Sequence, residues 1–170
     1  YVAGRTEYGE QACYRLTAPG IGREGGSSLD LNRLLFQGLF MAPGVVGEAV
    51  KGAHLASWTF KELGYPVNPS PFQVRTDVIQ AIRLGDPLKL QKFCRAIQQA
   101  SPIGSYLEPV PDLVPGYADP VIMAGGTFIE GSTLELSADG PLREPYIVYL
   151  QGGVHLAHME LALAQVLAVL

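Results

Sequence analysis

The chain has 170 residues, enough for one domain or for one small domain together with a piece of another. Apolar residues make up 48% and charged residues 16%, a composition that buries a substantial core and excludes long disorder. A formal net charge of −4 without clusters of Lys and Arg excludes a nucleic-acid partner, and no apolar run is long enough to span a membrane. Because no signal peptide is recognisable either, the expected location is the cytoplasm.

The first thirty residues are predicted to be mostly loop. Residues 1–4 are apolar, like the end of a strand, and the first residue is not Met, so we expect the protein to begin upstream of Tyr1. Residues 6–28 are polar and Gly-rich, with one short helix around 7–16. Residues 20–25 (GIGREG) match the pattern GxGxxG, but nucleotide binding requires a strand directly before it, which Pro19 disfavours. Nucleotide binding is therefore not expected.

A long helix is the strongest prediction from periodicity. Leucines and Phe40 recur at helical spacing from Leu29 to Pro43, where we expect a break. Apolar residues then recur at spacings of three and four, the pattern of one amphipathic helix that Gly64 ends as a C-terminal cap. This stripe consists of Val46, Ala49, Ala53, Ala56, Phe60 and Leu63.

The remainder of the chain predicts a small α+β domain. Residues 65–75 hold three prolines and form a crossover, followed by a strand over 76–84. Asp86 and Pro87 are a typical N-cap and first position of a helix, which Ser101-Pro102 ends. Three strands are expected at residues 120–124, 133–137 and 146–151, with turns at 130–131 and 139–140, and a last helix begins after residues 152–153. This order predicts a mostly antiparallel sheet with helices on one face.

Few side chains stand out as candidates for chemistry. His155 and His158 are three residues apart with no third ligand nearby, so we expect a solvated helix start and no metal site. His54 is expected to pack against its helix, and all four lysines lie on the polar sides of predicted helices, where none can form a Schiff base. Cys13 and Cys94 are expected to be buried free thiols, with a disulfide or a reactive thiol as the alternatives.

Two arginines could bind an anionic ligand. The guanidinium of Arg143, at the start of the last predicted strand, offers the planar fork that grips a carboxylate at two points. The alternative is a surface ion pair with Asp139 or Glu144. Arg75, just before the first strand of the small domain, is a similar but weaker candidate.

Four segments of the chain resemble one known family. They are CYRLTAPGIG (13–22), RTDVIQAI (75–82), GYADPVIMA (116–124), and ELSADGP (135–141) running on through REPYIVYLQGG (143–153). In this order they resemble the aluminium-resistance proteins, also called methionine gamma-lyase-like proteins, a family similar to the cystathionine lyase group of fold-type I pyridoxal-phosphate (PLP) enzymes. The resemblance covers essentially the whole chain.

The resemblance implies both an activity and an incomplete active site. The parent protein would be a PLP-dependent carbon–sulfur lyase acting on a sulfur amino acid, and its Schiff-base lysine would lie in an N-terminal part upstream of Tyr1. Residues 1–64 would be the end of the large PLP-binding domain plus the linking helix, and residues 67–170 the small C-terminal domain. The chain alone would therefore be inactive.

The resemblance also implies roles for individual residues. Arg143 would bind the substrate α-carboxylate, with Arg75 as a second candidate, although the arginine of the better-known lyases stands closer to the following glycine. Thr17 and Arg23 would lie near the cofactor or a subunit interface, and the protein would be a homo-oligomer, expected to be a tetramer. The alternative is a stand-alone, non-enzymatic domain that binds a small molecule or a protein.

Overall fold

The computed structural model describes residues 5–15, 31–114, 117–126 and 135–170. The chain divides into two compact units, residues 1–41 and 42–170. The first holds the helix α1 (Thr6–Arg15) and the first turns of α2 (Leu31–Glu62), on which large apolar side chains such as Phe36, Leu39 and Phe40 are exposed. The expected division into residues 1–64 and 67–170 stays a prediction.

The helix α2 buries four of the six residues of the predicted apolar stripe, whereas Val46 and Leu63 at its two ends are exposed. The predicted break at Pro43 is wrong. The helix continues through Pro43, although a proline inside a helix removes one backbone hydrogen bond and costs about 3 kcal/mol. The turns that follow offset this cost because Ala49, Ala53, Ala56 and Phe60 are fully buried. Gly64 ends the helix with a φ of +84°, as expected of a C-terminal glycine.

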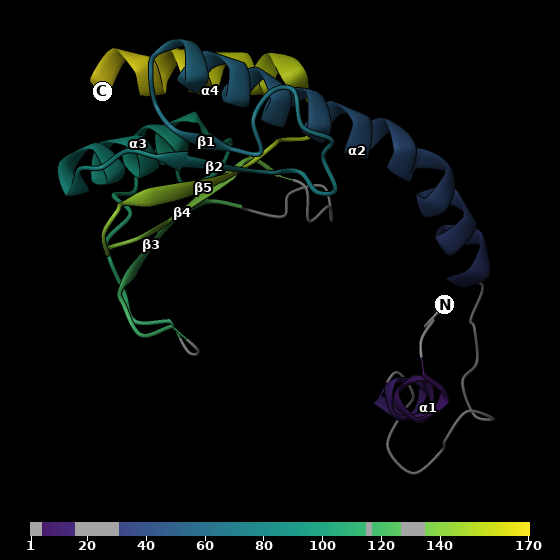
Figure 1. The fold of residues 1–170 in the computed structure, drawn as a ribbon. Helices are drawn as coiled ribbons and strands as arrows, with labels where there is room; N and C mark the ends of the chain where they lie inside the picture. Colours follow the sequence, from purple (N-terminus) through teal and green to yellow (C-terminus); the bar gives the residue numbers. More distant parts are fainter. Residues whose placement is uncertain (1–4, 16–30, 115–116, 127–134) are drawn as a thin grey trace. The chain divides into compact units, whose positions relative to one another are not determined.

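The second unit contains a five-stranded antiparallel sheet in the order β1-β2-β5-β4-β3 (Figure 1). Its strands are β1 (Val67–Asn68), β2 (Ile79–Arg83), β3 (Val121–Gly125), β4 (Ser137–Pro141) and β5 (Ile147–Gln151). The α+β class and the mostly antiparallel sheet are confirmed. The two-residue strand β1, inside the predicted crossover, was not expected.

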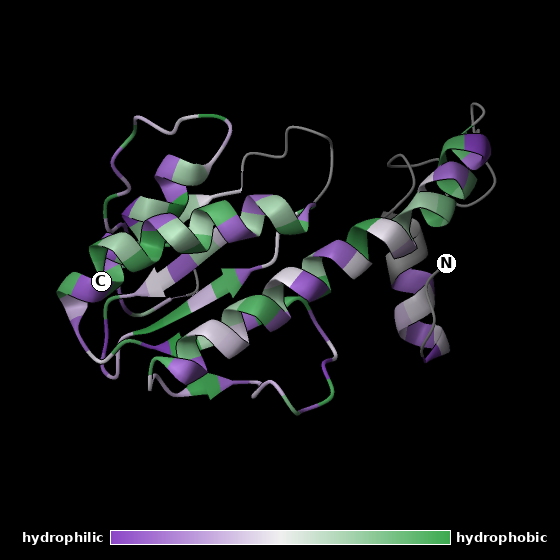
Figure 2. Ribbon diagram, turned by 90° about the horizontal axis from the view of Figure 1, so that it is seen from above, coloured by the Kyte–Doolittle hydropathy of each residue, from purple (hydrophilic) through white to green (hydrophobic). Residues whose placement is uncertain are grey.

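Helices cover one face of this sheet. The helices α3 (Pro87–Ala100) and α4 (Leu156–Val169) pack together with the later turns of α2 over the strands, as Figures 1 and 2 show from two sides. The start of α3 is as predicted, because one oxygen of Asp86 accepts hydrogen bonds from the backbone N–H groups of Leu88 (2.7 Å) and Lys89 (2.9 Å). The core between the layers includes Phe60, Ile82, Phe93, Ile122, Leu150 and Met159.

The strand β4 corrects two predictions. A strand was expected at 133–137 and a turn at Asp139-Gly140, whereas β4 begins at Ser137 and carries both residues in its interior. The glycine serves the packing of α3 on the sheet, since a Cβ on Gly140 would lie 3.0 Å from Sγ of Cys94 and Cδ1 of Leu90. The turn expected at 130–131 lies outside the described residues.

The face of the sheet opposite the helices carries no described helix, and we call it the open face. It is formed by the exposed residues of three neighbouring strands, Met123, Asp139 and Tyr149. The register pairs Met123 with Asp139 and Asp139 with Tyr149, so the three side chains form one row across the strands. This row forms part of the wall of a cavity.

Candidate functional site

A cavity of about 370 Å³ lies on the open face. The loop before β3 and the turn between β4 and β5 form its rim. Two contacts hold this rim together, a bridge between Asp112 and Val121 and a 2.8 Å hydrogen bond from Leu142 N–H to the carbonyl of Pro120. The lining residues are Val114, Tyr117, Val121, Met123, Asp139, Pro141, Arg143 and Tyr149. The lining is mostly apolar with a few charged groups, as is typical of small-molecule sites.

Arg143 is one of the two charged residues that line this cavity. Its backbone carbonyl accepts a 2.7 Å hydrogen bond from the N–H of Tyr146, which closes a tight turn. Tyr146 has a φ of 55°, in the left-handed region that a bulky side chain rarely adopts. A carbonyl contact from Tyr146 to the N–H of Leu84 (2.9 Å) ties this conformation to the sheet. Such backbone strain is concentrated at functional sites in proteins, which favours a role for this turn.

The ion pair of Arg143 differs from the alternative drawn from the sequence. Its Nη1 lies 3.6 Å from Oδ2 of Asp119, and neither Asp139 nor Glu144 forms a described ion pair with it. At 3.6 Å the contact is longer than a hydrogen bond, and the Arg143 side chain is 63% exposed. The guanidinium fork therefore remains free to bind a ligand carboxylate from the cavity.

Asp139 is the second charged residue of the lining. It lies in the middle of β4 between Met123 and Tyr149, and partial burial raises the pKa of its carboxyl group. On the helix side of the sheet, a Cβ at the neighbouring Gly140 would lie 3.0 Å from Sγ of Cys94. Burial, together with the charge of Asp139, raises the pKa of the Cys94 thiol to about 12. Cys94 is thus a buried, free and neutral thiol, as predicted.

Arg75 has other partners. Its guanidinium donates to the backbone carbonyls of Ala53 (3.1 Å) and Ile79 (3.1 Å) and to the side chain of Gln80. Burial lowers its pKa. Through these contacts Arg75 joins α2 to the beginning of β2, and the beginning of β2 pairs with the end of β5. Arg143 lies before the other end of β5, where that strand begins. The structure therefore does not bring the two candidate arginines together, and the contacts of Arg75 are those of a structural residue.

None of the four lysines lines the cavity. Lys51, Lys61 and Lys92 are exposed on helices, and Lys89 donates a 2.8 Å hydrogen bond to the hydroxyl of Tyr65. A Schiff base with PLP needs a lysine amine in the cofactor site. The described residues therefore do not fit the cofactor, although they fit a substrate carboxylate. Thr17, Arg23 and the glycine segment at 20–25 lie outside the described residues.

The histidines contribute to the packing of α4. Nδ1 of His155 accepts a hydrogen bond from the N–H of Ala157 (3.2 Å), so this exposed residue caps the helix, a role that the predicted solvated helix start did not include. His158 is half-buried rather than solvated, and its Nε2 lies 2.7 Å from the carbonyl of Ala100 at the end of α3.

Among the described residues, no three metal-ligating side chains gather at one place. No helix in this part of the chain is long and apolar enough to cross a membrane.

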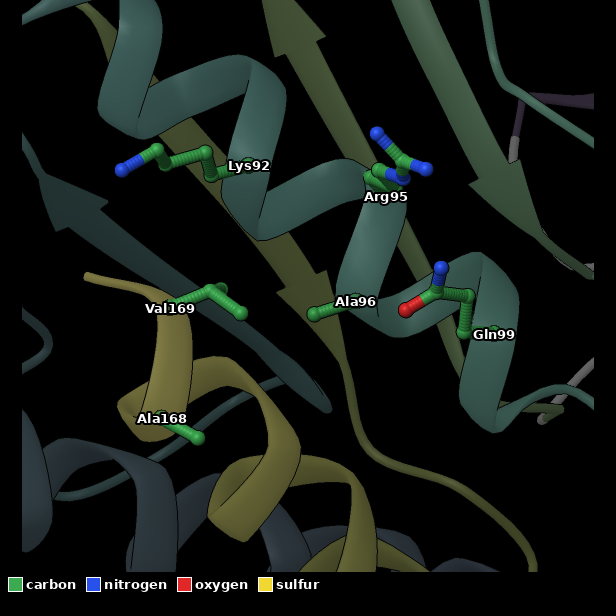
Figure 3. A pocket seen from close by; sticks show the side chains of 6 residues that line it. All are labelled: Lys92, Arg95, Ala96, Gln99, Ala168 and Val169. Atoms are coloured by element: carbon green, nitrogen blue, oxygen red, sulfur yellow. The ribbon is translucent and has the colours of Figure 1, made fainter.

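A second hollow, of about 480 Å³, lies between α3 and α4 (Figure 3). Its lining has two cations, Lys92 and Arg95, which point away from one another in Figure 3. Arg95 also forms a 3.3 Å ion pair with Glu108. Because its charged groups do not converge, this hollow is a weaker candidate than the cavity on the open face.

Sequence reasoning did not place Asp139 and Tyr149 in the cavity wall, and it did not identify Asp119 as the ion-pair partner of Arg143. Asp139 was interpreted as part of a turn, although Leu136, Ala138 and Gly140 are buried and the residues between them point outward. This period of two was the signal that could have placed Asp139 on the open face. No local pattern indicates that Asp119 would meet a residue 24 positions later.

Comparison with known proteins gives consistent results over the whole chain. The family model described as methionine gamma-lyase matches residues 1–170. Among curated proteins, the uncharacterized protein YnbB of Bacillus subtilis is 47% identical over 96% of this chain and 39% of its own length. An uncharacterized 33.9 kDa protein of Lactobacillus delbrueckii subsp. bulgaricus is 45% identical over 95% of this chain and 53% of its own.

Solved structures share the fold. A carbon-sulfur lyase involved in aluminum resistance from Clostridium novyi is 46% identical, with a TM-score of 0.79, over 94% of this chain and 37% of its own. A candidate cystathionine beta-lyase involved in aluminum resistance from Clostridium acetobutylicum is 48% identical, with a TM-score of 0.84, over 99% of this chain and 39% of its own. The chain thus spans about two fifths of these proteins.

Proposed function

Because the chain belongs to the methionine gamma-lyase family, we propose that it is the C-terminal part of a PLP-dependent carbon–sulfur lyase. The observation that supports this most directly is its 46% identity to a structure named as a carbon-sulfur lyase. The reaction proposed is the cleavage of a sulfur amino acid with water to a thiol, ammonia and a 2-oxo acid. PLP, when bound in the whole protein, withdraws electrons from the substrate's α-carbon.

The part of this reaction assigned to the chain is the binding of the substrate's carboxylate. Arg143 would grip the α-carboxylate through its guanidinium fork, because it lines a cavity and its only described ion pair is a loose one to Asp119. The turn that ends at Tyr146 fixes the backbone from which the Arg143 side chain extends. The lysine that binds PLP would come from the rest of the protein. We propose that the whole protein is a cytoplasmic homo-oligomer, whose remaining subunit contacts would also lie outside this chain.

The test is an assay of the full-length protein that contains this chain. After loading with PLP, it should release a 2-oxo acid, ammonia and a thiol from at least one sulfur amino acid in equal amounts. The 170-residue chain alone is the control and should release none, since no lysine lines its cavity. Full-length protein that binds PLP but cleaves no sulfur amino acid would contradict the proposal.

A stand-alone amino-acid-binding domain is the second candidate. It is favoured by the position of the cavity, whose lining residues all belong to the compact unit 42–170. Calorimetry of the isolated chain against sulfur amino acids tests it. Heat of binding would support this candidate, whereas no heat together with aggregation would indicate a fragment that needs the rest of the protein.

A further inference from the structure

The first turns of α2 expose large apolar side chains that the described residues leave uncovered. Each of them is more than half exposed, and Phe40 is the most open at 83%. We call this set the α2 girdle, and it consists of Leu34, Leu35, Phe36, Leu39, Phe40 and Met41. The other described helix of the unit 1–41, α1, does not pack against α2. Contiguous exposed apolar patches mark interaction sites in proteins.

The α2 girdle is wider than the apolar stripe of an ordinary surface helix. A helix that packs on one neighbour has a stripe roughly 100° wide. The girdle instead has two runs of three consecutive apolar residues, 34–36 and 39–41, and the side chains of each run point in three directions about 100° apart. Only the side shared by Arg33 and Gln37, which are one turn apart, is polar. A helix that is apolar on most sides is typical of a core.

The width of the girdle indicates what kind of surface covers it. A second copy of the chain that pairs helix to helix would cover one stripe and leave the other sides in water. An apolar groove would cover three sides and leave Arg33 and Gln37 at its opening. The solved relatives have enough further chain to form such a groove, because this chain spans only 37% of one and 39% of the other.

We propose that residues 31–41 dock into an apolar groove formed by the part of the full-length protein that precedes this chain. The inference rests on the proposed function only in that the chain is the C-terminal part of a longer protein, and it does not depend on the reaction. The walls of the groove are apolar, and its opening faces the polar side of the helix. The α2 girdle is then the contact through which this part of α2 is held in the whole protein.

Photo-crosslinking in the full-length protein tests this contact. The photoreactive amino acid p-benzoylphenylalanine is introduced in place of Phe40 or of Leu35, which lie on different sides of the helix, and in place of Gln37 as the control. Illumination of the first two proteins should give a product with the mass of one chain. Mass spectrometry of its digest should join residue 40 or 35 to a peptide that precedes this chain. The control should lose most of this product, because Gln37 lies at the opening.

A smaller probe covers the case in which the benzoyl group prevents folding. Photo-methionine differs from methionine by a diazirine ring and can be incorporated throughout the protein. The crosslinked peptide that contains Met41 then gives the same information, since Met41 belongs to the girdle.

Each product decides the inference. Crosslinks from both Phe40 and Leu35 to the preceding part support it, even if the protein cleaves no sulfur amino acid, so a failure of the lyase proposal is seen separately. A product with the mass of two chains would mean that a second copy covers the girdle, and a crosslink to residues 1–30 would mean that this chain covers it. Either result, a crosslink from only one of the two positions, equal crosslinking at Gln37, or none at all would overturn the inference.

Discussion

The two faces of the sheet are built for different purposes. Towards the helices, Ile82, Ile122, Val148 and Leu150 are almost completely buried. On the open face, Met123 is 56% exposed and the neighbouring strands carry a carboxylate and a phenol. The same five-residue strands supply both sets, because consecutive side chains point to opposite sides. Substitutions on the helix-covered face should therefore change stability, and substitutions on the open face should change ligand binding.

The largest expected effect separates two neighbours on β5. Leu150 is fully buried and Tyr149 is 38% exposed on the open face. Leu150→Ala should lower the free energy of unfolding by about 3 kcal/mol, since it leaves a cavity in the core. Tyr149→Ala should cost less than about 1 kcal/mol but weaken ligand binding. Urea unfolding and calorimetry on both variants measure this contrast, and equal losses of stability would contradict the account of the two faces.

The second prediction concerns the close contact between α2 and the residues that follow β5. A Cβ on Gly152 would lie 2.0 Å from the backbone carbonyl oxygen of Ala49, whereas one on Gly153 would make only ordinary contacts of 3.4 Å and more. Gly152→Ala should therefore destabilise the protein by about 2–3 kcal/mol through overpacking. Gly153→Ala is the matched control and should stay within about 0.5 kcal/mol. If both variants unfold at the same urea concentration, the close contact is absent in solution.

A smaller effect concerns the charge on the open face. Because burial raises the pKa of Asp139, the folded state holds its proton more tightly than the unfolded state does. The stability that this tighter proton binding provides is present below the pKa that Asp139 has in the unfolded chain. It is lost as the pH rises through the pKa of Asp139 in the folded protein. Asp139→Asn should therefore be slightly more stable than the unmodified protein at pH 7, by up to about 0.5 kcal/mol, and lose this advantage near pH 3. Thermal unfolding of both proteins at several pH values measures this difference in stability. A variant that is less stable than the unmodified protein at pH 7 would contradict the prediction.

Local chemistry predicted the parts of the fold that depend on neighbouring residues. Asp86 and Pro87 start α3, and Gly64 ends α2, through contacts within one or two turns. The interior of β4 was missed because Gly140 is required by α3, which packs on it from elsewhere in the sequence. A glycine after an aspartate is typical of a turn, and only the packing of distant segments shows which role applies.

The candidate site shows the same limit. The fork of Arg143 and the family resemblance identified one residue of the cavity from the sequence. Its pairing with Asp119 depends on the loop before β3 reaching the turn before β5, through the hydrogen bond between Leu142 and Pro120. Arg75 was chosen for its guanidinium and its place just before the first strand of the small domain, and its contact with Ala53 arises only when α2 packs beside β2.

The most direct test of the account is the kinetics of Arg143→Ala in the full-length, PLP-loaded protein. Losing a two-point, charge-assisted contact should lower kcat/KM for a sulfur amino acid about 10- to 100-fold, mainly through KM, while the amount of bound PLP stays unchanged. Arg143→Lys keeps the charge but not the fork and should recover only part of the loss. Unchanged kinetics in Arg143→Ala would remove Arg143 from the site and contradict the assignment of the cavity on the open face to the substrate.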